Sequence, residues 1–264
     1  MKDVCGQESE KLLSDGIELG SFRVRLAQTN KDKDEVFKLR YQIFNEELGE
    51  GIPENEITKR DVDKFDEHCD HLIVEKGGLI IGSYRMLPYA KSLLTDGFYS
   101  ESEFSIRKLP IDLTLSVETG RASVSPDHRK QATLLCLFVG IRHYMNLIKA
   151  RYIFGMASLA KMSHESANAT YEEIKQMGKT IEFPGVGPID GMKIPEGIQG
   201  GVPEVPPLLA VYFKVGASIC SKPAYDPIFK CHDLLTLSDI TQVPDKTWNL
   251  FGRFVSRKNV EEKI

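Results

Sequence analysis

Two opposite charges, Glu118 and Arg121, interrupt the otherwise uncharged stretch "SVETGRASV" that begins at Ser116. Placing a charged pair in a buried strand is unfavourable unless partners or water satisfy both charges. One interpretation is a structural ion pair, in which Arg121 bonds to nearby carboxylates. The other is a cleft, in which Glu118 binds a substrate amine or takes its proton.

The spacing of this pair raises a geometric question. Strand residues three apart point to opposite faces of a sheet unless a bulge intervenes. Gly120 lies between the two charges, and glycine inside a strand often marks a bulge. We therefore expect a bulge near Gly120 if Glu118 and Arg121 act together.

A second candidate site follows directly in "SPDHRKQAT", where Arg129 and Lys130 precede a largely apolar segment that begins near Thr133. The start of a helix exposes unpaired N–H groups and a partial positive charge, which together favour phosphate. A solvated loop with ordinary helix capping is the more common use of such a sequence. Both interpretations stay open from the residues alone.

A third candidate is the acidic segment "DVDKFDEHCDH", which holds Asp61, Asp63, Asp66 and His68. Its spacing fits neither a calcium-binding EF-hand nor a two-histidine zinc helix, so we predict no metal site. A solvated acidic face and an amine-recognition loop both remain possible uses.

Two arginines, Arg40 and Arg85, stand at expected helix and strand positions. Either fits an ordinary surface residue. Arginine is also the usual choice for a bidentate contact with a carboxylate or phosphate.

Composition excludes several classes of protein. The chain has 264 residues, 41% hydrophobic and 27% charged, with a net charge of −4, which argues against nucleic-acid binding. Ten acids lie between residues 46 and 70, and six bases lie between 121 and 151. The first region suits cations or amines, and the second suits phosphates or an acidic partner.

No nucleophile elbow, phosphate-binding P-loop or dinucleotide fingerprint is present in the sequence.

The cysteines and apolar runs bear on location. Five cysteines without a C-x-x-C pair fit a reducing cytoplasm better than a disulfide framework. No run reaches the roughly 18 apolar residues that span a bilayer. We expect a cytoplasmic protein, with room for peripheral contact with the inner membrane.

Hydrophobic patterning predicts the elements that hold these residues. Residues 1–20 read as a polar leader and 21–264 as one domain, with a long acidic loop at 49–69 and an irregular Gly/Pro-rich insertion at 179–207. The expected strands are 22–27, 71–76, 79–88, 113–124, 151–158 and 231–240, and the expected helices are 32–48, 133–150, 163–177 and 206–216. This order favours a mixed, mostly antiparallel sheet with helices on both faces.

Several of these motifs occur together in one known family. The stretches "LRYQIF", "DVDKFDEHCDHLIV", "GSYRML", "GFYSESEF", "VETGRASVSPDHR", "YIFGMAS" and "PPLLAVYFKVGA" resemble the hemolysin-like N-acyltransferases that form lyso-ornithine lipid. That resemblance covers roughly residues 19–240 and implies an α/β fold of the GNAT type. It also implies transfer of a 3-hydroxyacyl chain from acyl carrier protein to the α-amine of an amino acid.

The sequence is similar, more distantly, to acyl-homoserine-lactone synthases. Their charged pattern maps onto Arg40, Phe44, Asp63, Asp66 and Arg85, followed by Glu118 and Arg121. In those enzymes such charges shape the amine-substrate end of the site. The segment 163–201 departs from the ornithine-lipid enzymes, and "HRKQAT" lacks the glycines of the usual GNAT phosphate loop.

The resemblance also implies where the two substrates bind. The pantetheine arm of the donor, acyl carrier protein or CoA, would lie where strands 113–124 and 151–157 separate, with no tightly bound cofactor. Donor contacts then fall on Ser123, Val124, Arg129, Lys130 and Thr133. Glu118 and Arg121 become the catalytic pair, and the basic stretch 121–151 suits an acidic carrier.

Two alternatives remain. One is an acyl-homoserine-lactone or other signal synthase, which would use S-adenosylmethionine as acceptor. The other is a non-catalytic acyl- or lipid-binding protein of the kind that the hemolysin label suggests, although no strongly amphipathic membrane helix is evident.

Overall fold

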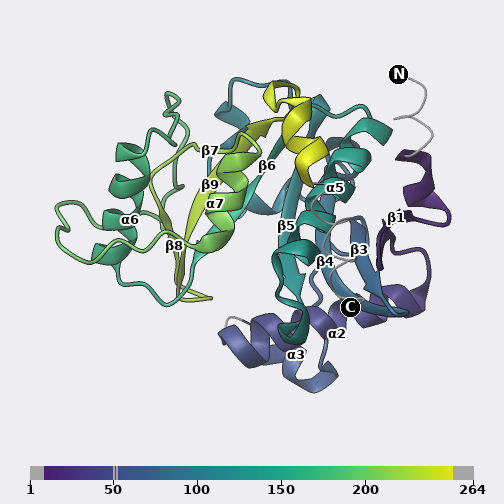
Figure 1. Ribbon diagram of the computed structural model, residues 1–264. Helices are drawn as coiled ribbons and strands as arrows, with labels where there is room; N and C mark the ends of the chain where they lie inside the picture. Colours follow the sequence, from purple (N-terminus) through teal and green to yellow (C-terminus); the bar gives the residue numbers. More distant parts are fainter. Residues whose placement is uncertain (1–8, 50, 52, 252–264) are drawn as a thin grey trace.

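The computed structural model describes residues 9–49, 51 and 53–251. Within them, one nine-stranded sheet runs in the order β1-β2-β3-β4-β5-β6-β9-β7, and β8 also pairs with β9 (Figure 1). The strands are β1 (Ile17–Leu19), β2 (Phe22–Leu26), β3 (Asp70–Lys76), β4 (Leu79–Pro88), β5 (Ser116–Val124), β6 (Tyr152–Leu159), β7 (Ser218–Ile219), β8 (Ala224–Asp226) and β9 (Cys231–Asp239). Only β5 and β6 pair in parallel in this sheet, so the expected mixed, mostly antiparallel GNAT-like sheet is confirmed.

Helices cover both faces of this sheet. The longer ones are α2 (Asn30–Tyr41), continued by the π-helix η2 (Gln42–Leu48), α5 (Gln131–Leu147), α6 (His164–Gln176) and α7 (Pro207–Lys214). The short ones are α3 (Pro53–Thr58), α4 (Tyr89–Ser92), η1 (Lys11–Leu13), η3 (Tyr99–Ser102), η4 (Ile106–Lys108), η5 (Leu113–Leu115), η6 (Pro126–His128) and η7 (Ile240–Gln242), and residues 245–251 are also helical.

The two faces are separated by the alternation of β3. Leu72 and Val74 join the large core under α5, α6 and α7, whereas the ring of His71 meets Phe37 of α2 at 5.4 Å on the other side. A smaller apolar cluster built around Phe98, Phe104 and Phe154 completes that second side. In Figure 1, α5 and α7 stand in front of the sheet and α2 with α3 lies at its lower end. The result is the expected three-layer α-β-α arrangement.

The hairpin of β3 and β4 follows its sequence signal. Gly77 and Gly78 both have positive φ, at 58° and 81°, which is the backbone that a two-residue hairpin turn of type I′ requires. Gly49 ends η2 in the left-handed conformation at φ 72°, as expected for the end of the first helix.

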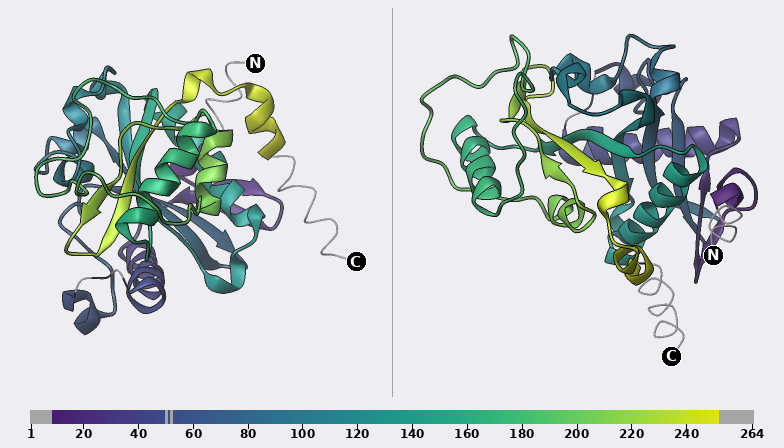
Figure 2. Two further views of the ribbon diagram at one scale, coloured as in Figure 1. Left: turned by 90° about the vertical axis from the view of Figure 1, so that its left-hand side faces the viewer. Right: turned by 90° about the horizontal axis from the view of Figure 1, so that it is seen from above.

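Several expected boundaries were wrong. Within the expected long loop 49–69, α3 is helical, and the expected strand 113–124 begins with the short helix η5. Within the expected leader, Leu12 is fully buried and β1 adds an edge strand, so this part of the chain packs on the sheet. The insertion 179–207 has neither helix nor regular strand, as expected, except that α7 takes its last residue, and Figure 2 shows it looping around α6. The division into a leader and one domain stays a prediction.

Strand β5 carries the expected bulge. Ser83 of β4 pairs with Ser123, but Arg85 pairs with Gly120, so β5 has one extra residue between these pairs. The left-handed residue is Arg121, at φ 53°, rather than Gly120. The bulge therefore re-aims the strand at the residue whose charge was unexplained.

Strands β5 and β6 pair only at their beginning. Their parallel register covers Ser116–Glu118 against Tyr152–Phe154 and no residue beyond. A Cβ on Gly155 would lie 2.1 Å from the Thr119 carbonyl oxygen, so only glycine fits where the two strands are closest. The strands separate beyond this contact. The expected parting of the two parallel strands is confirmed.

Candidate active site

A cavity of about 240 Å³ fills the space between the separated strands. Its walls come from β5 at Glu118–Ala122, β6 at Met156–Ser158, and β9 at Cys231 and Asp233, with α7 and η3 closing two sides. Leu208, Leu209 and Tyr212 give one wall an apolar lining, while the opposite parts carry charges. Such a mixture of apolar walls and few polar groups is typical of a small-molecule site.

One set of charges lies on the α2 side, and we call it the arginine cluster. It consists of Arg40, Arg85, Arg121, Asp61, Asp63 and Asp66. Arg40 is fully buried, with its Nε 3.0 Å from Asp61 and its Nη1 2.6 Å from Asp66. Arg85 donates to Asp63 at 2.6 Å and lies 3.5 Å from Asp66.

The arginine cluster balances three cations with three carboxylates. Burial alone would raise the pKa of Asp66, but the nearby Arg40 and Arg85 outweigh it and hold that pKa far below its usual range. Asp66 is thus an anion that forms ion pairs with Arg40 and Arg85. The Asp63 backbone N–H also donates a hydrogen bond to it at 2.8 Å. The expected residues Arg40, Asp63, Asp66 and Arg85 do come together, but Arg40, Asp63 and Asp66 do not line the cavity.

Arg121 is the least satisfied member of the cluster. Its Nε and Nη2 stay 3.5 and 3.6 Å from Asp61 and Asp63, and its buried Nε has no hydrogen-bond partner. The rings of Phe44 and Tyr99 each lie 5.3 Å from its guanidinium carbon, so aromatic faces hold the group in place at the cavity wall. The guanidinium of Arg121 is therefore held in position while its Nε–H donor has no partner.

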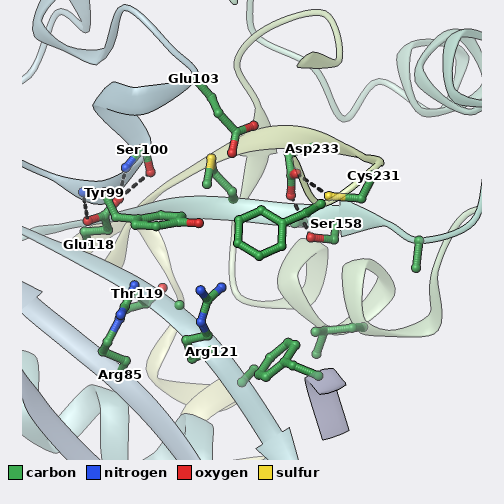
Figure 3. A pocket seen from close by; sticks show the side chains of 18 of the residues that line it. Arg85, Tyr99, Ser100, Glu103, Glu118, Thr119, Arg121, Ser158, Cys231 and Asp233 are labelled. Carbon is green, nitrogen blue, oxygen red and sulfur yellow. Dashed lines mark hydrogen bonds between the residues drawn. The ribbon is translucent and has the colours of Figure 1, made fainter. Parts of the chain in front are cut away.

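Glu118 lies on the same side of β5 as Arg121, as a consequence of the bulge. Its carboxylate accepts the backbone N–H groups of Tyr99 and Ser100, at 2.7 and 2.6 Å, and the Ser100 hydroxyl (Figure 3). Burial raises the pKa of Glu118, and these three donors oppose that rise. A carboxylate offers about four acceptor positions, so about one stays available toward the cavity that Glu118 lines.

A second set of charges was missed by the sequence analysis, and we call it the acid group. It comprises Glu103, Asp226 and Asp233, all buried and all lining the cavity. Burial raises the pKa of Glu103 to about 9, and the neighbouring carboxylates Asp233 and Asp226 contribute to this rise. A signal existed, because Asp233 interrupts the apolar strand "CHDLLTLSDI" just as Glu118 interrupts β5.

The five expected donor residues lie apart from this cavity. Ser123 and Thr133 are buried, and their hydroxyls donate to the carbonyl oxygens of Arg121 and His128 at 3.1 and 2.9 Å. Arg129 pairs with Glu47 at 2.5 Å and donates to the Val124 carbonyl oxygen at 3.4 Å. Lys130 occupies the N-cap of α5 without a capping side-chain bond. Their part in donor binding stays a prediction.

Comparisons with known proteins agree with this architecture. Residues 39–139 match the family described as "Acetyltransferase (GNAT) domain". The chain is 26% identical to the L-ornithine N(alpha)-acyltransferase of Agrobacterium fabrum, over 91% of this chain and 88% of that protein. It is 27% identical to the enzyme of the same name from Rhizobium meliloti, over 90% and 87%.

A solved structure gives the same fold. A CoA-dependent acyl-homoserine lactone synthase superposes with a TM-score of 0.52 at 17% identity, over 84% of this chain and 81% of that one. Within the residues that the structure describes, no helix is both long and apolar enough to cross a bilayer. The GNAT match, the sheet topology and the curated relatives identify this chain as an acyltransferase with a GNAT-type fold.

Proposed function

We propose that the protein moves a (3-hydroxy)fatty acyl chain from a thioester to the α-amine of ornithine, giving a lyso-aminolipid. The curated relatives of that name support ornithine as acceptor. The observation that carries the proposal is the separation of β5 and β6 beyond Glu118, which opens a cavity with an apolar wall and two charged walls. An acyl thioester and a zwitterionic amino acid need those two environments side by side.

Arg121 is the proposed partner of the acceptor's α-carboxylate. Its unpaired Nε and its place between two aromatic rings give a fixed, bidentate donor at the cavity wall. Phe44 and Arg85 also line the cavity and form part of the same wall. Arg40, Asp63 and Asp66 then act behind them, by holding Arg85 and Arg121 in position.

Transfer is direct in this proposal. The neutral α-amine attacks the thioester carbonyl, a C–N bond forms, the C–S bond breaks, and the carrier leaves as a thiol. The amine must lose a proton, and Glu118 takes it at its remaining acceptor position, directly or through water. Burial, which raises the pKa of Glu118, favours proton acceptance. A backbone N–H at the bulge polarises the thioester carbonyl in this proposal.

The proposed donor arm enters past Gly120, which has no side chain, and Ala122, which has a small one, so the β5 wall is open there. A Cβ built on Gly120 would meet nothing within 4 Å. The phosphate end lies toward Arg129, Lys130 and Thr133 at the start of α5, where Arg129 would have to exchange Glu47 for the donor. The basic stretch 121–151 suits an acidic acyl carrier protein as the donor, and peripheral membrane contact would serve release of the product.

The test is an assay with the purified protein, ornithine and either 3-hydroxyacyl-acyl carrier protein or 3-hydroxyacyl-CoA, read by mass spectrometry. N-acyl-ornithine is expected, with faster turnover from the carrier protein. Glu118→Gln should lower kcat by about 10²- to 10⁴-fold, the usual worth of a general base, and flatten the pH profile of kcat. Asp239→Asn, a change on β9 outside the cavity, is the matched control.

Two results would contradict the proposal. The first is no N-acyl product with any amino acid from either donor. The second is an acyl-homoserine lactone with release of methylthioadenosine when S-adenosylmethionine is the acceptor, which would assign the chain to signal synthesis. Membrane damage that survives loss of Glu118, without any product, would instead indicate a non-catalytic lipid-binding protein.

A further inference from the structure

The acid group differs from every other set of carboxylates around the cavity. Glu103 is 2% exposed, lines the cavity, and its buried Oε2 has no hydrogen-bond partner. Figure 3 shows its carboxylate directed into the pocket, toward the side from which Asp233 projects. A buried polar atom without a partner is uncommon in a folded protein and requires an explanation, such as a bound group.

The partners of the other two members are all neutral. Asp226 accepts the backbone N–H groups of Ile228 and Phe229 at 2.6 and 3.1 Å. Asp233 accepts the Ser158 hydroxyl at 2.7 Å and the Cys231 thiol at 3.2 Å. Within the described part of the chain, no arginine, lysine or histidine forms an ion pair with any of the three.

This arrangement gives the three carboxyl groups, when ionised, no cation in contact. Three buried carboxylates in one wall repel one another. In the absence of a bound cation, uptake of a proton relieves this repulsion. Arg121 lowers the pKa of both Glu103 and Asp233, although its ion pairs are made with Asp61 and Asp63. A cation entering from the cavity would satisfy the group. No set of three described His, Cys, Asp or Glu side chains is arranged to hold a metal ion, so an organic ammonium is the better occupant.

We propose that Glu103 and Asp233, with Asp226 behind them, bind the side-chain ammonium of the acceptor and thereby select a diamino acid. This inference rests on the proposed function. Arg121 and the acid group face each other across the cavity (Figure 3), so one molecule places its α-carboxylate at Arg121 and its ammonium at Glu103. The α-amine then lies between them, beside Gly120, where the strands separate.

The acid group also accounts for selection against neutral amino acids. An acceptor without a side-chain amine leaves Glu103 Oε2 unpaired, whereas ornithine supplies a charge-assisted hydrogen bond to it. Such bonds are worth about 10- to 100-fold in binding. The backbone of Glu103 forms its structural hydrogen bonds, donating to the Ser100 carbonyl oxygen and accepting from the Ile189 N–H. Its carboxylate is therefore not needed to hold this segment in place.

The experiment compares ornithine with norvaline, which has the same carbon chain and no side-chain amine. Both kcat/KM and the calorimetric Kd are measured for the wild type, Glu103→Gln, Asp233→Asn and the control Asp239→Asn. The wild type and the control should prefer ornithine by about 10- to 100-fold. Glu103→Gln and Asp233→Asn should bring that ratio close to one. Each variant should lower kcat/KM and weaken binding for ornithine while leaving both values for norvaline unchanged.

Equal losses for the two amino acids would overturn the inference, because they would indicate proton transfer or folding as the role of Glu103. An unchanged ratio would overturn it as well. The binding arm separates this inference from the proposed function: if no amide forms, the ratio of Kd values still decides whether the acid group recognises the ammonium.

Discussion

The arginine cluster reaches the cavity through Arg85 and Arg121, the acid group lines another part of it, and the two sets are built in opposite ways. In the arginine cluster every carboxylate has an arginine partner, and Arg40 is fully buried and paired with both Asp61 and Asp66. In the acid group Glu103 has an oxygen with no partner, and Asp226 and Asp233 have only neutral ones. Removing one partner from a paired set of buried charges is costly to stability, whereas an unpaired carboxylate is available to a ligand.

The largest expected effect comes from breaking the paired set at its centre. Arg40→Met keeps most of the side-chain volume but leaves Asp61 and Asp66 with one buried cation fewer. We expect a loss of about 3–5 kcal/mol in the free energy of unfolding, measured by urea denaturation. A loss below about 1 kcal/mol would show that the cluster is not a structural unit.

The second effect concerns Arg121, the member of the cluster whose buried Nε has no hydrogen-bond partner. Arg121→Gln should raise KM for ornithine by about 10- to 100-fold, while the free energy of unfolding changes far less than in Arg40→Met. Arg121→Lys, which keeps the charge and loses the fork, should recover part of the KM. A large fall in stability with an unchanged KM would make Arg121 purely structural.

The third effect is a pH dependence of stability that arises in the acid group. Burial and the neighbouring Asp233 and Asp226 raise the pKa of Glu103 to about 9 in the folded protein, and Arg121 opposes this rise. Between the unfolded pKa of about 4.3 and that value the folded state holds the extra proton, so stability falls as pH rises. The slope is up to about 1.4 kcal/mol per pH unit, and it ends above about pH 9.

Glu103→Gln removes this titration, so its stability relative to the wild type should grow from pH 5.5 to pH 8.5. Thermal melts at the two values provide the measurement. Asp233, whose pKa is also raised by burial, leaves a residual slope in the variant. Parallel pH curves for the two proteins would show that Glu103 carries its charge in the folded state and has a partner.

The smallest effect is expected outside both sets, at the exposed pair of Arg129 and Glu47. Arg129→Gln should change the free energy of unfolding by less than about 1 kcal/mol, because exposed ion pairs contribute little. If the start of α5 holds the donor's phosphate, KM for the acyl donor rises while KM for ornithine stays constant. An unchanged donor KM would remove Arg129 from the donor site.

The sequence predicted features whose signals are local. Gly77 and Gly78 specified the hairpin, and Gly120 beside Arg121 specified a bulge that the structure confirms. The parting of β5 from β6 was expected from resemblance and is confirmed by the end of their pairing at Glu118. These features depend on a few neighbouring residues, so patterning could find them.

Features that depend on distant residues were not predictable in the same way. The short strands β1, β7 and β8 have two or three residues each and exist only because longer strands lie beside them. The acid group joins Glu103 and Asp233, 130 positions apart, and neither has a motif of its own. Arg40, Asp63, Asp66 and Arg85 lie close together, but only three-dimensional pairing shows that Arg85 alone of these four lines the cavity, and their role in substrate binding stays a prediction.

The most direct test of the account is an experimental structure with ornithine bound. We predict the α-carboxylate on Arg121, the side-chain ammonium within hydrogen-bond distance of Glu103 Oε2 and Asp233, and the α-amine free beside Gly120. Ornithine in the reverse orientation, with its α-amine held by the acid group, would contradict the account, because that amine could not then attack a thioester between β5 and β6.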